Sequence, residues 1–156
     1  MVFCGGGWTF RILCGKIRSV KEIELKKVSN ARIGRVNTCG AHLEAHEYDT
    51  IYFLASYGFD IEIIKPSNTP KTSNPDFLIK GAIWEAKSPN GSGSSTIARQ
   101  FHKAGKQADR LVLDLRRIRL SVDISEKEAK KRFASSRNIK RLLLITKDNR
   151  LLDIRK

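Results

Sequence analysis

The most regular pattern in the sequence is a set of positions between residues 41 and 57 that recur every three or four residues. These positions are Leu43, Glu47, Ile51 and Leu54. Such spacing places side chains on one face of an α-helix. Gly58 follows at the point where a glycine commonly ends a helix. The pattern therefore predicts a helix over residues 41–57.

Short strand-like segments follow this helix. Their ranges are 59–64, 76–79 and 82–86. Residues 66–75 are rich in Ser, Asn, Thr and Pro, and this composition predicts a loop between the first two strands. Lys80 and Gly81 separate the last two strands, and so short a connection predicts a tight β-hairpin.

The rest of the chain alternates between helical and strand-like segments. A loop rich in Gly and Ser over residues 88–95 precedes a helix over 96–108, whose apolar residues fall on one side. Ser125 followed by Glu128 has the spacing of a capping box and predicts the start of another helix. The strands predicted in this half cover residues 110–115, 141–146 and 150–154. The order from residue 41 is α-β-β-β-α-β-α-β-β, which predicts an α/β fold with helices flanking a mixed sheet.

Residues 1–40 show less regular patterns, namely a short strand-like segment at 8–13 and partial alternation at 20–28. Basic residues recur throughout this stretch, which is therefore predicted to be a basic N-terminal arm or small subdomain. Residues 41–156 then form the main domain. The total length of 156 residues suits one compact core.

The chain carries a large excess of positive charge. Thirty Lys and Arg residues against sixteen Asp and Glu give a formal net charge of +14, and the pI is about 10.1. Such an excess favours a polyanionic partner such as nucleic acid. No apolar run reaches the roughly 18 residues that span a membrane, and no signal-peptide pattern opens the chain. We therefore expect no membrane contact, and either a cytoplasmic protein or a fragment released from something larger.

The predicted hairpin brings charged side chains together. A turn at Lys80 and Gly81 places Asp76 opposite Glu85, with Cβ atoms about 4.5–5.5 Å apart. Lys87 follows Glu85 by two residues and points from the same face of the strand. The other face carries the apolar residues that can anchor the hairpin: Phe77, Ile79, Trp84 and Ala86. Asp76, Glu85 and Lys87 are therefore expected to point into one basic cleft.

Two carboxylates at this distance repel each other, and a bound cation would remove that repulsion. Hard oxygen ligands suit Mg²⁺ or Mn²⁺, whereas Zn²⁺ is less suited because the Cys and His residues lack a usual zinc spacing. An ion held by Asp76 and Glu85 can polarise a phosphate, and Lys87 can orient water or stabilise developing negative charge. These are the parts of a phosphodiesterase. The alternative is a surface hairpin whose charges form only salt bridges.

The arrangement resembles the PD-(D/E)xK nuclease superfamily. The residues that carry this resemblance are Pro75-Asp76 and Glu85-Ala86-Lys87. The predicted α-β-β-β-α-β order is also that of the superfamily's core. The resemblance implies catalytic roles for Asp76, Glu85 and Lys87, with Asp76 and Glu85 as metal ligands. It also implies a supplementary metal ligand on the preceding helix, which would be Glu47, with Glu44 as the rival.

Residues 41–117 also look like the C-terminal toxin domains of contact-dependent growth inhibition proteins, which are tRNA nucleases. The likeness runs from the hairpin through the Gly- and Ser-rich loop and Gln100 to residues 111–117. It implies that residues 41–156 are a nuclease domain that acts on RNA in the bacterial cytoplasm. It further implies delivery as the C-terminal part of a secreted toxin, and a partner in the form of an acidic immunity protein.

Several residues around the predicted site are candidates for binding nucleic acid. They are Ser88, Thr96, Arg99, Gln100 and Lys103. The resemblance implies that Gln100 faces the site, whereas Arg99 and Lys103 belong to a basic stripe suited to phosphate contacts. Ser88 and Thr96 could bind phosphate through their hydroxyl groups or helix amides. Ordinary surface or capping roles are the alternatives for all five, and His102 is an alternative general base.

The sequence therefore predicts a metal-dependent endoribonuclease whose substrate is tRNA. Two alternatives stay open. One is a DNA endonuclease of the resolvase or restriction type that uses the same residues. The other is a basic protein that binds nucleic acid without cleaving it. Nothing in the sequence predicts the oligomeric state.

Overall fold

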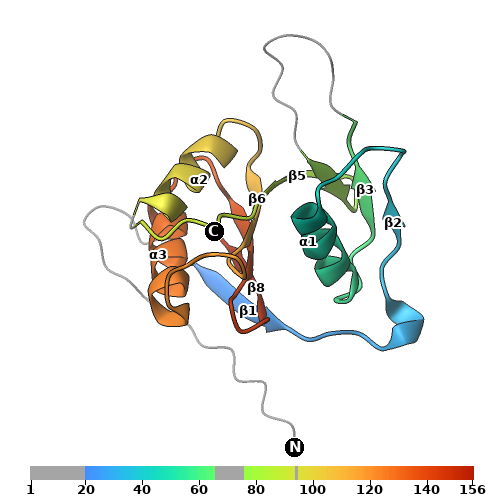
Figure 1. Cartoon of the computed structure of the whole chain (residues 1–156), viewed down its shortest axis with the longest axis horizontal. Helices are drawn as coiled ribbons and strands as arrows, with labels where there is room; N and C mark the ends of the chain where they lie inside the picture. The colour runs from blue at the N-terminus through green and yellow to red at the C-terminus, as the bar shows by residue number, and fades with distance from the viewer. Residues whose placement is uncertain (1–19, 66–75, 94) are drawn as a thin grey trace, which may run out of the picture.

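The computed structural model describes residues 20–65, 76–93 and 95–156. Within them a mixed sheet is flanked by three helices (Figure 1). The elements are β1 (Lys21–Leu25), the 3-10 turn η1 (Asn30–Arg32), β2 (Val36–Asn37), α1 (Ala45–Ala55), β3 (Ile61–Ile63), β4 (Phe77–Ile79), β5 (Ala82–Lys87), α2 (Thr96–Ala104), β6 (Arg110–Asp114), α3 (Val122–Ser135), β7 (Arg141–Ile145) and β8 (Leu151–Arg155). The order from α1 onward confirms the predicted order of helices and strands.

The described strands form one sheet in the order β1-β8-β7-β6-β5-β4-β3-β2. Its centre, β5, β6 and β7, is parallel. The strands β4 and β8 on either side of this centre run antiparallel to their neighbours. Because β5 and β6 are parallel neighbours, their carboxyl ends meet at one edge of the sheet. In open α/β sheets ligands bind at such an edge.

Alternate residues of the central strands enter two separate cores. In β6, Leu111 and Leu113 belong to the cluster that also contains residues of α2 and α3. Val112 belongs to the cluster that contains residues of α1. Helices α2 and α3 therefore cover one face of the sheet and α1 covers the other, as Figure 1 shows.

Helix α1 begins later than the pattern predicts, at Ala45. A capping box fixes this start, because the Glu44 side chain accepts from the backbone of Glu47 while the Glu47 side chain accepts from the backbone of Glu44. At the other end, the helix stops at Ala55 and Ser56 is its C-cap, so the predicted helix also extends two residues too far. Gly58, with a φ of 83°, lies in the turn that follows.

Helix α3 begins at Val122, and the predicted start at Ser125 is wrong. Ser121 is the N-cap, and its hydroxyl oxygen accepts from the Ile124 N–H at 3.4 Å. Ser125 lies inside the helix, is 1% exposed and donates to the Val122 carbonyl at 3.0 Å. Both serines precede a helical pattern, so the spacing of Ser125 and Glu128 was misleading.

One other predicted segment also differs from the structure. Helix α2 ends at Ala104, and Gly105 caps it, so the predicted helix over 96–108 is too long. The predicted loop at 66–75 and the predicted strand at 8–13 lie outside the described residues.

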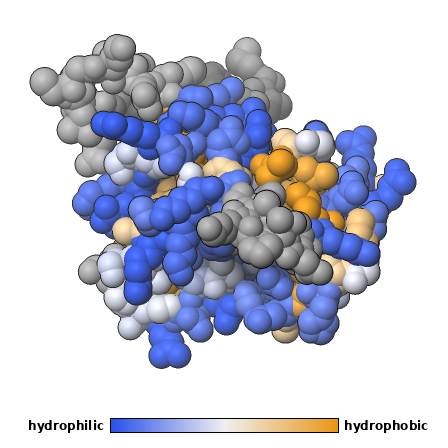
Figure 2. All heavy atoms as spheres, turned by 90° about the horizontal axis from the view of Figure 1, so that it is seen from above, coloured by the Kyte–Doolittle hydropathy of each residue, from blue (hydrophilic) through white to orange (hydrophobic). Residues whose placement is uncertain are grey.

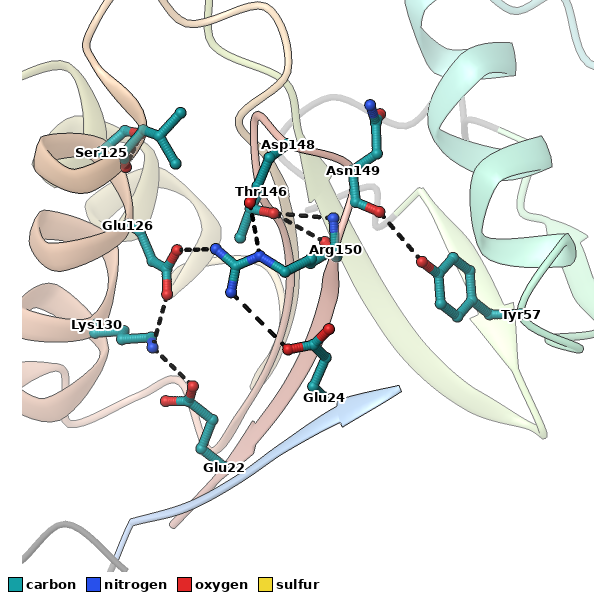
Figure 3. A network of polar contacts seen from close by, with 11 residues as sticks. Glu22, Glu24, Tyr57, Ser125, Glu126, Lys130, Thr146, Asp148, Asn149 and Arg150 are labelled. Atoms are coloured by element: carbon teal, nitrogen blue, oxygen red, sulfur yellow. Dashed lines mark hydrogen bonds and ion pairs between the residues drawn. The ribbon is translucent and has the colours of Figure 1, made fainter. Parts of the chain in front are cut away.

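Residues 20–40, part of the predicted basic arm, supply the two edge strands of the sheet, β1 and β2. A charged network joins β1 to α3 and to the β7–β8 turn (Figure 3). In it Arg150 contacts Asp148 at 2.8 Å and Glu126 at 2.7 Å, and Lys130 contacts Glu22 at 2.7 Å. The division of the chain at residue 40 stays a prediction.

Hydrophilic residues predominate on the face drawn in Figure 2, which also carries one hydrophobic patch on its right side.

In the described ranges, the helices are all too short or too polar to cross a membrane.

A buried carboxylate, that of Asp153 in β8, binds two arginines. Asp153 is 3% exposed and accepts from Arg141 at 2.9 Å and from Arg155 at 2.5 Å. Burial alone would raise the pKa of Asp153, but these two guanidinium groups outweigh burial and hold it below the ordinary value of 3.8. A carboxyl group with a lowered pKa stabilises the fold above its unfolded pKa, and this stability is lost as the pH falls through the folded pKa.

We expect Asp153→Asn to lower the free energy of unfolding at pH 7 by about 1–3 kcal/mol, because the charged hydrogen bonds are lost. The difference in free energy of unfolding between wild type and variant should shrink as the pH falls below 3.8, since Asp153 of the wild type then becomes protonated and loses its charge, as Asn has none. Urea unfolding between pH 7 and pH 2.5 measures this, with the exposed Asp49→Asn as control. A difference that stays constant over this pH range would contradict a stabilising role for the charged Asp153 carboxylate.

Candidate active site

The β4–β5 hairpin has the register that the sequence predicts. Lys80 and Gly81 both have positive φ, 51° and 74°, as the turn of a tight hairpin requires. Phe77 pairs with Trp84, Leu78 with Ile83 and Ile79 with Ala82. Asp76 lies one position before β4, and its N–H donates to the Trp84 carbonyl at 3.2 Å, so the predicted pairing of Asp76 with Glu85 is not part of the strand ladder.

Asp76 is the more accessible of the two carboxylates. One of its oxygens accepts from the Ala86 N–H at 2.6 Å. Burial raises the pKa of Asp76 above its ordinary value, and the charge of Glu47 acts in the same direction. The Ala86 hydrogen bond and the charge of Lys87 oppose this rise. Asp76 is therefore close enough to Glu47 and Lys87 for both charges to act on it.

Glu85 has no exposed surface. Its Oε1 accepts from the Lys87 ammonium group, while its Oε2 has no partner within the described part of the chain. Burial raises the pKa of Glu85 to about 6, and the neighbouring Asp76 also raises it, whereas Lys87 lowers it. The site thus contains a buried carboxylate with one oxygen in an ion pair and, within the described residues, no partner for the other.

The apolar face of the hairpin anchors these charges. Glu85 pairs with Leu111, a residue of the α2 and α3 core, so Glu85 points toward α2. Trp84 and Phe77 point to the other face, are each 1% exposed and belong to the core under α1. The guanidinium of Arg141 lies 5.3 Å from the centre of the Trp84 ring.

A cavity of about 590 Å³ opens at the carboxyl end of β5. It is lined by five of the residues predicted for the site: Glu47, Asp76, Lys87, Ser88 and Gln100. Glu85 lies behind the lining, which corrects the expectation that all three hairpin charges point into the cleft. Among the described residues of the lining, the charges of Glu47 and Asp76 balance those of Lys87 and Arg117.

Glu47 lines this cavity, and its rival Glu44 does not. One oxygen of Glu47 accepts from the Glu44 N–H at 2.7 Å as part of the capping box. The Glu44 carboxylate lies instead 3.2 Å from His46 Nδ1, and His46 also lines the cavity.

The remaining predicted residues lie outside the cavity lining. Arg99, His102 and Lys103 are exposed on α2. Thr96 is 4% exposed at the first position of α2. These positions follow from the helical turn, since Ile97 and Phe101 face the core and the residues between them face away or sideways. Of the residues predicted on α2, Gln100 is the one that lines the cavity.

The sequence interpretation missed a buried network beside the cavity. Asp114 ends β6, is 2% exposed and accepts from Thr50 Oγ1 at 2.7 Å and from Arg116 Nη2 at 2.6 Å. The Arg116 guanidinium lies 4.6 Å from the centre of the Phe53 ring. The network therefore ties α1 to the end of β6. The sequence does contain a signal for this network: Asp114 stands at the end of an apolar strand, shortly before Arg116 and Arg117.

The described residues contain no group of three or more His, Cys, Asp and Glu side chains arranged to hold a metal ion. Two buried atoms at the site nevertheless have no hydrogen-bond partner among the residues that the structure describes, namely Glu85 Oε2 and Ser88 Oγ. Asp76 and Glu85 thus fit an ion that takes few protein ligands and keeps several waters, as Mg²⁺ does.

Comparison with protein families identifies the class of protein that this fold and site define. The family described as "Contact-dependent growth inhibition CdiA C-terminal domain" matches residues 72–151, which is just over half of the chain. The chain therefore belongs to this family and is a toxin domain. The matched segment includes Asp76, Glu85, Lys87 and Gln100 but not Glu47.

A solved chain supports the fold. It comes from the "CdiA-CT/CdiI toxin and immunity complex from Burkholderia pseudomallei" and aligns with a TM-score of 0.60 at 18% identity. The alignment covers 79% of this chain and 100% of that one. Identity this low shows a common fold. Among curated proteins, no sequence matches.

We expect Asp114→Ala to lower the free energy of unfolding by about 2–4 kcal/mol, because it leaves Arg116 without its buried partner. Asp109→Ala is the matched control, since the Asp109 side chain is exposed and pairs with its neighbour Arg110 on the surface; it should change stability by less than about 0.5 kcal/mol. Urea unfolding of both variants gives the comparison. Equal losses would show that the network does not hold α1 to β6.

Proposed function

We propose that this toxin domain is a metal-dependent nuclease of the PD-(D/E)xK type that hydrolyses RNA, with tRNA as its substrate. The observation that carries the proposal is that Asp76 and Lys87 line one cavity while Glu85, paired with Lys87, lies directly behind that lining. Glu85 is fully buried there with one oxygen unpartnered. The element order around the hairpin and the Asp76…Glu85-x-Lys87 spacing agree with that superfamily.

Asp76 and Glu85 would hold a Mg²⁺ or Mn²⁺ ion, and Glu47 would assist from the start of α1. The unpartnered Glu85 oxygen gives this pair a free ligand atom. Such an ion, when bound, polarises a phosphate and lowers the pKa of a water molecule. The small number of available side-chain ligands suits Mg²⁺ or Mn²⁺ better than Zn²⁺.

Lys87 stands between the buried carboxylate and the cavity. Its ion pair with Glu85 restricts the ammonium group to the site. From there it can stabilise negative charge that develops on the phosphate, or orient the attacking water. Gln100 and Ser88, which also line the cavity, can donate hydrogen bonds to the phosphate or sugar.

The charge of +14 supports a nucleic-acid substrate, because a polyanion gains affinity by releasing counterions. RNA rather than DNA is our choice because of the resemblance to tRNA nuclease toxins. Delivery as the C-terminal part of a secreted protein and action in the bacterial cytoplasm belong to the same proposal.

We further propose an immunity protein as partner, since the solved chain with this fold comes from a toxin and immunity complex. A net charge of +14 favours an acidic surface on such a partner.

The first test is cleavage of total tRNA and of plasmid DNA with Mg²⁺ or Mn²⁺. We expect Asp76→Ala and Lys87→Ala each to reduce tRNA cleavage at least about 100-fold, since each removes a group that acts on the transition state. Asp49→Ala is the control, because Asp49 is an exposed acid on α1 that does not line the cavity.

Undiminished cleavage by both site variants would refute the site assignment. Cleavage of plasmid alone would favour the DNA endonuclease. Salt-sensitive binding without cleavage of either substrate would favour the non-catalytic alternative.

A second test measures the metal directly. Saturating Mg²⁺ should raise the Tm of the wild-type protein by roughly 5–10 °C, because an ion that binds only the folded state stabilises it. Glu85→Gln should abolish this increase, whereas Glu62→Gln, on the exposed side of β3, should retain it. An equal increase in both variants would exclude Glu85 as a ligand.

A further inference from the structure

The cavity extends beyond the charged residues of the hairpin. Its volume is about 590 Å³, whereas a water molecule takes about 30 Å³ of the liquid, so the cavity can accept a ligand of nucleotide size. Arg117, in the loop that follows β6, lines the same cavity. This residue was not among those predicted for the site.

The backbone on both sides of Arg117 is fixed. Before it, Arg116 is held by the buried Asp114. After it, Ile118 is 2% exposed in the core and its N–H donates to the Leu115 carbonyl at 3.1 Å. The Arg119 N–H donates to the Gly91 carbonyl at 3.1 Å, which joins this loop to the loop after β5. The structure therefore holds Arg117 in place at the edge where β5 and β6 end.

The side chain of Arg117, in contrast, is exposed and has no hydrogen bond or ion pair to the part of the chain that the structure describes. Lys87, the other Lys or Arg among the described residues of the lining, is already paired with Glu85. Arg117 thus offers an exposed positive charge on a fixed backbone at the cavity.

A nucleic acid carries a negative charge on every nucleotide, so a substrate whose scissile phosphate lies at Asp76 and Lys87 brings adjacent phosphates with it. A planar guanidinium binds phosphate through paired hydrogen bonds better than an ammonium group does. We propose that Arg117 binds a phosphate that flanks the scissile one. This inference rests on the proposed nuclease function, and it makes Arg117 a substrate-binding residue.

Kinetics with total tRNA test the proposal. Arg117→Ala should raise KM about tenfold, as expected for the loss of a charged hydrogen bond, and should change kcat much less. Arg117→Lys should lie between wild type and Arg117→Ala, because it keeps the charge but not the planar geometry. Arg137→Ala removes the same charge from an exposed residue outside the cavity and should leave both constants unchanged.

Binding without cleavage gives an independent readout. With chelator present, the logarithm of the association constant for total tRNA falls linearly with the logarithm of the salt concentration. The steepness of this fall should be smaller by about 1 in Arg117→Ala, because one phosphate contact is lost. Arg137→Ala should keep the wild-type slope. Equal Tm values for wild type and both variants would establish that all of them fold.

An Arg117→Ala variant that matches Arg137→Ala in both KM and salt slope would overturn the proposal. If the wild-type protein cleaves neither tRNA nor plasmid, the proposed nuclease function fails. The salt slope does not depend on cleavage, so it still decides whether Arg117 contacts phosphate.

Discussion

A carboxylate without exposed surface is costly to bury unless charge and hydrogen bonds replace the lost water. Glu85 is such a group, and within the described residues Lys87 compensates it at one oxygen only. The apolar face of the same hairpin offsets this cost. Phe77 and Trp84 are almost fully buried, and complete burial of a large apolar side chain contributes about 1.5–3 kcal/mol. The chemistry of the site and the core under α1 therefore depend on the same two short strands.

The parallel pairing of β5 with β6 adds the second constraint. It brings the loops after both strands to one edge, where Asp114 also fixes α1 through Thr50. Residues from both layers of the fold can therefore contribute to one cavity. Glu47 comes from α1 on one face, and Gln100 comes from α2 on the other. The described part of the cavity is therefore assembled at the edge of the sheet.

Local patterns in the sequence predicted the order of elements and the hairpin register, because both depend on short-range periodicity and on the two-residue turn. They failed where two residues of similar chemistry compete, as Ser121 and Ser125 do for the N-cap of α3. They also failed to separate burial from exposure at Glu85, since strand alternation gives the face of a side chain but not what covers it. Asp114 and Arg117 were missed because their role depends on contacts between distant segments.

The pairing of β1 with β8 has a consequence for solubility. Strand β8 is nearly all buried, with the sequence Leu-Leu-Asp-Ile-Arg, and as an outer strand it would present a hydrophobic edge that other chains could extend by strand addition. Strand β1 covers that edge and takes the outer position itself. Its Lys21, Glu22 and Glu24 place charges along the exposed edge, which discourages pairing between molecules. The first strand of the described fold thus protects the last one from aggregation.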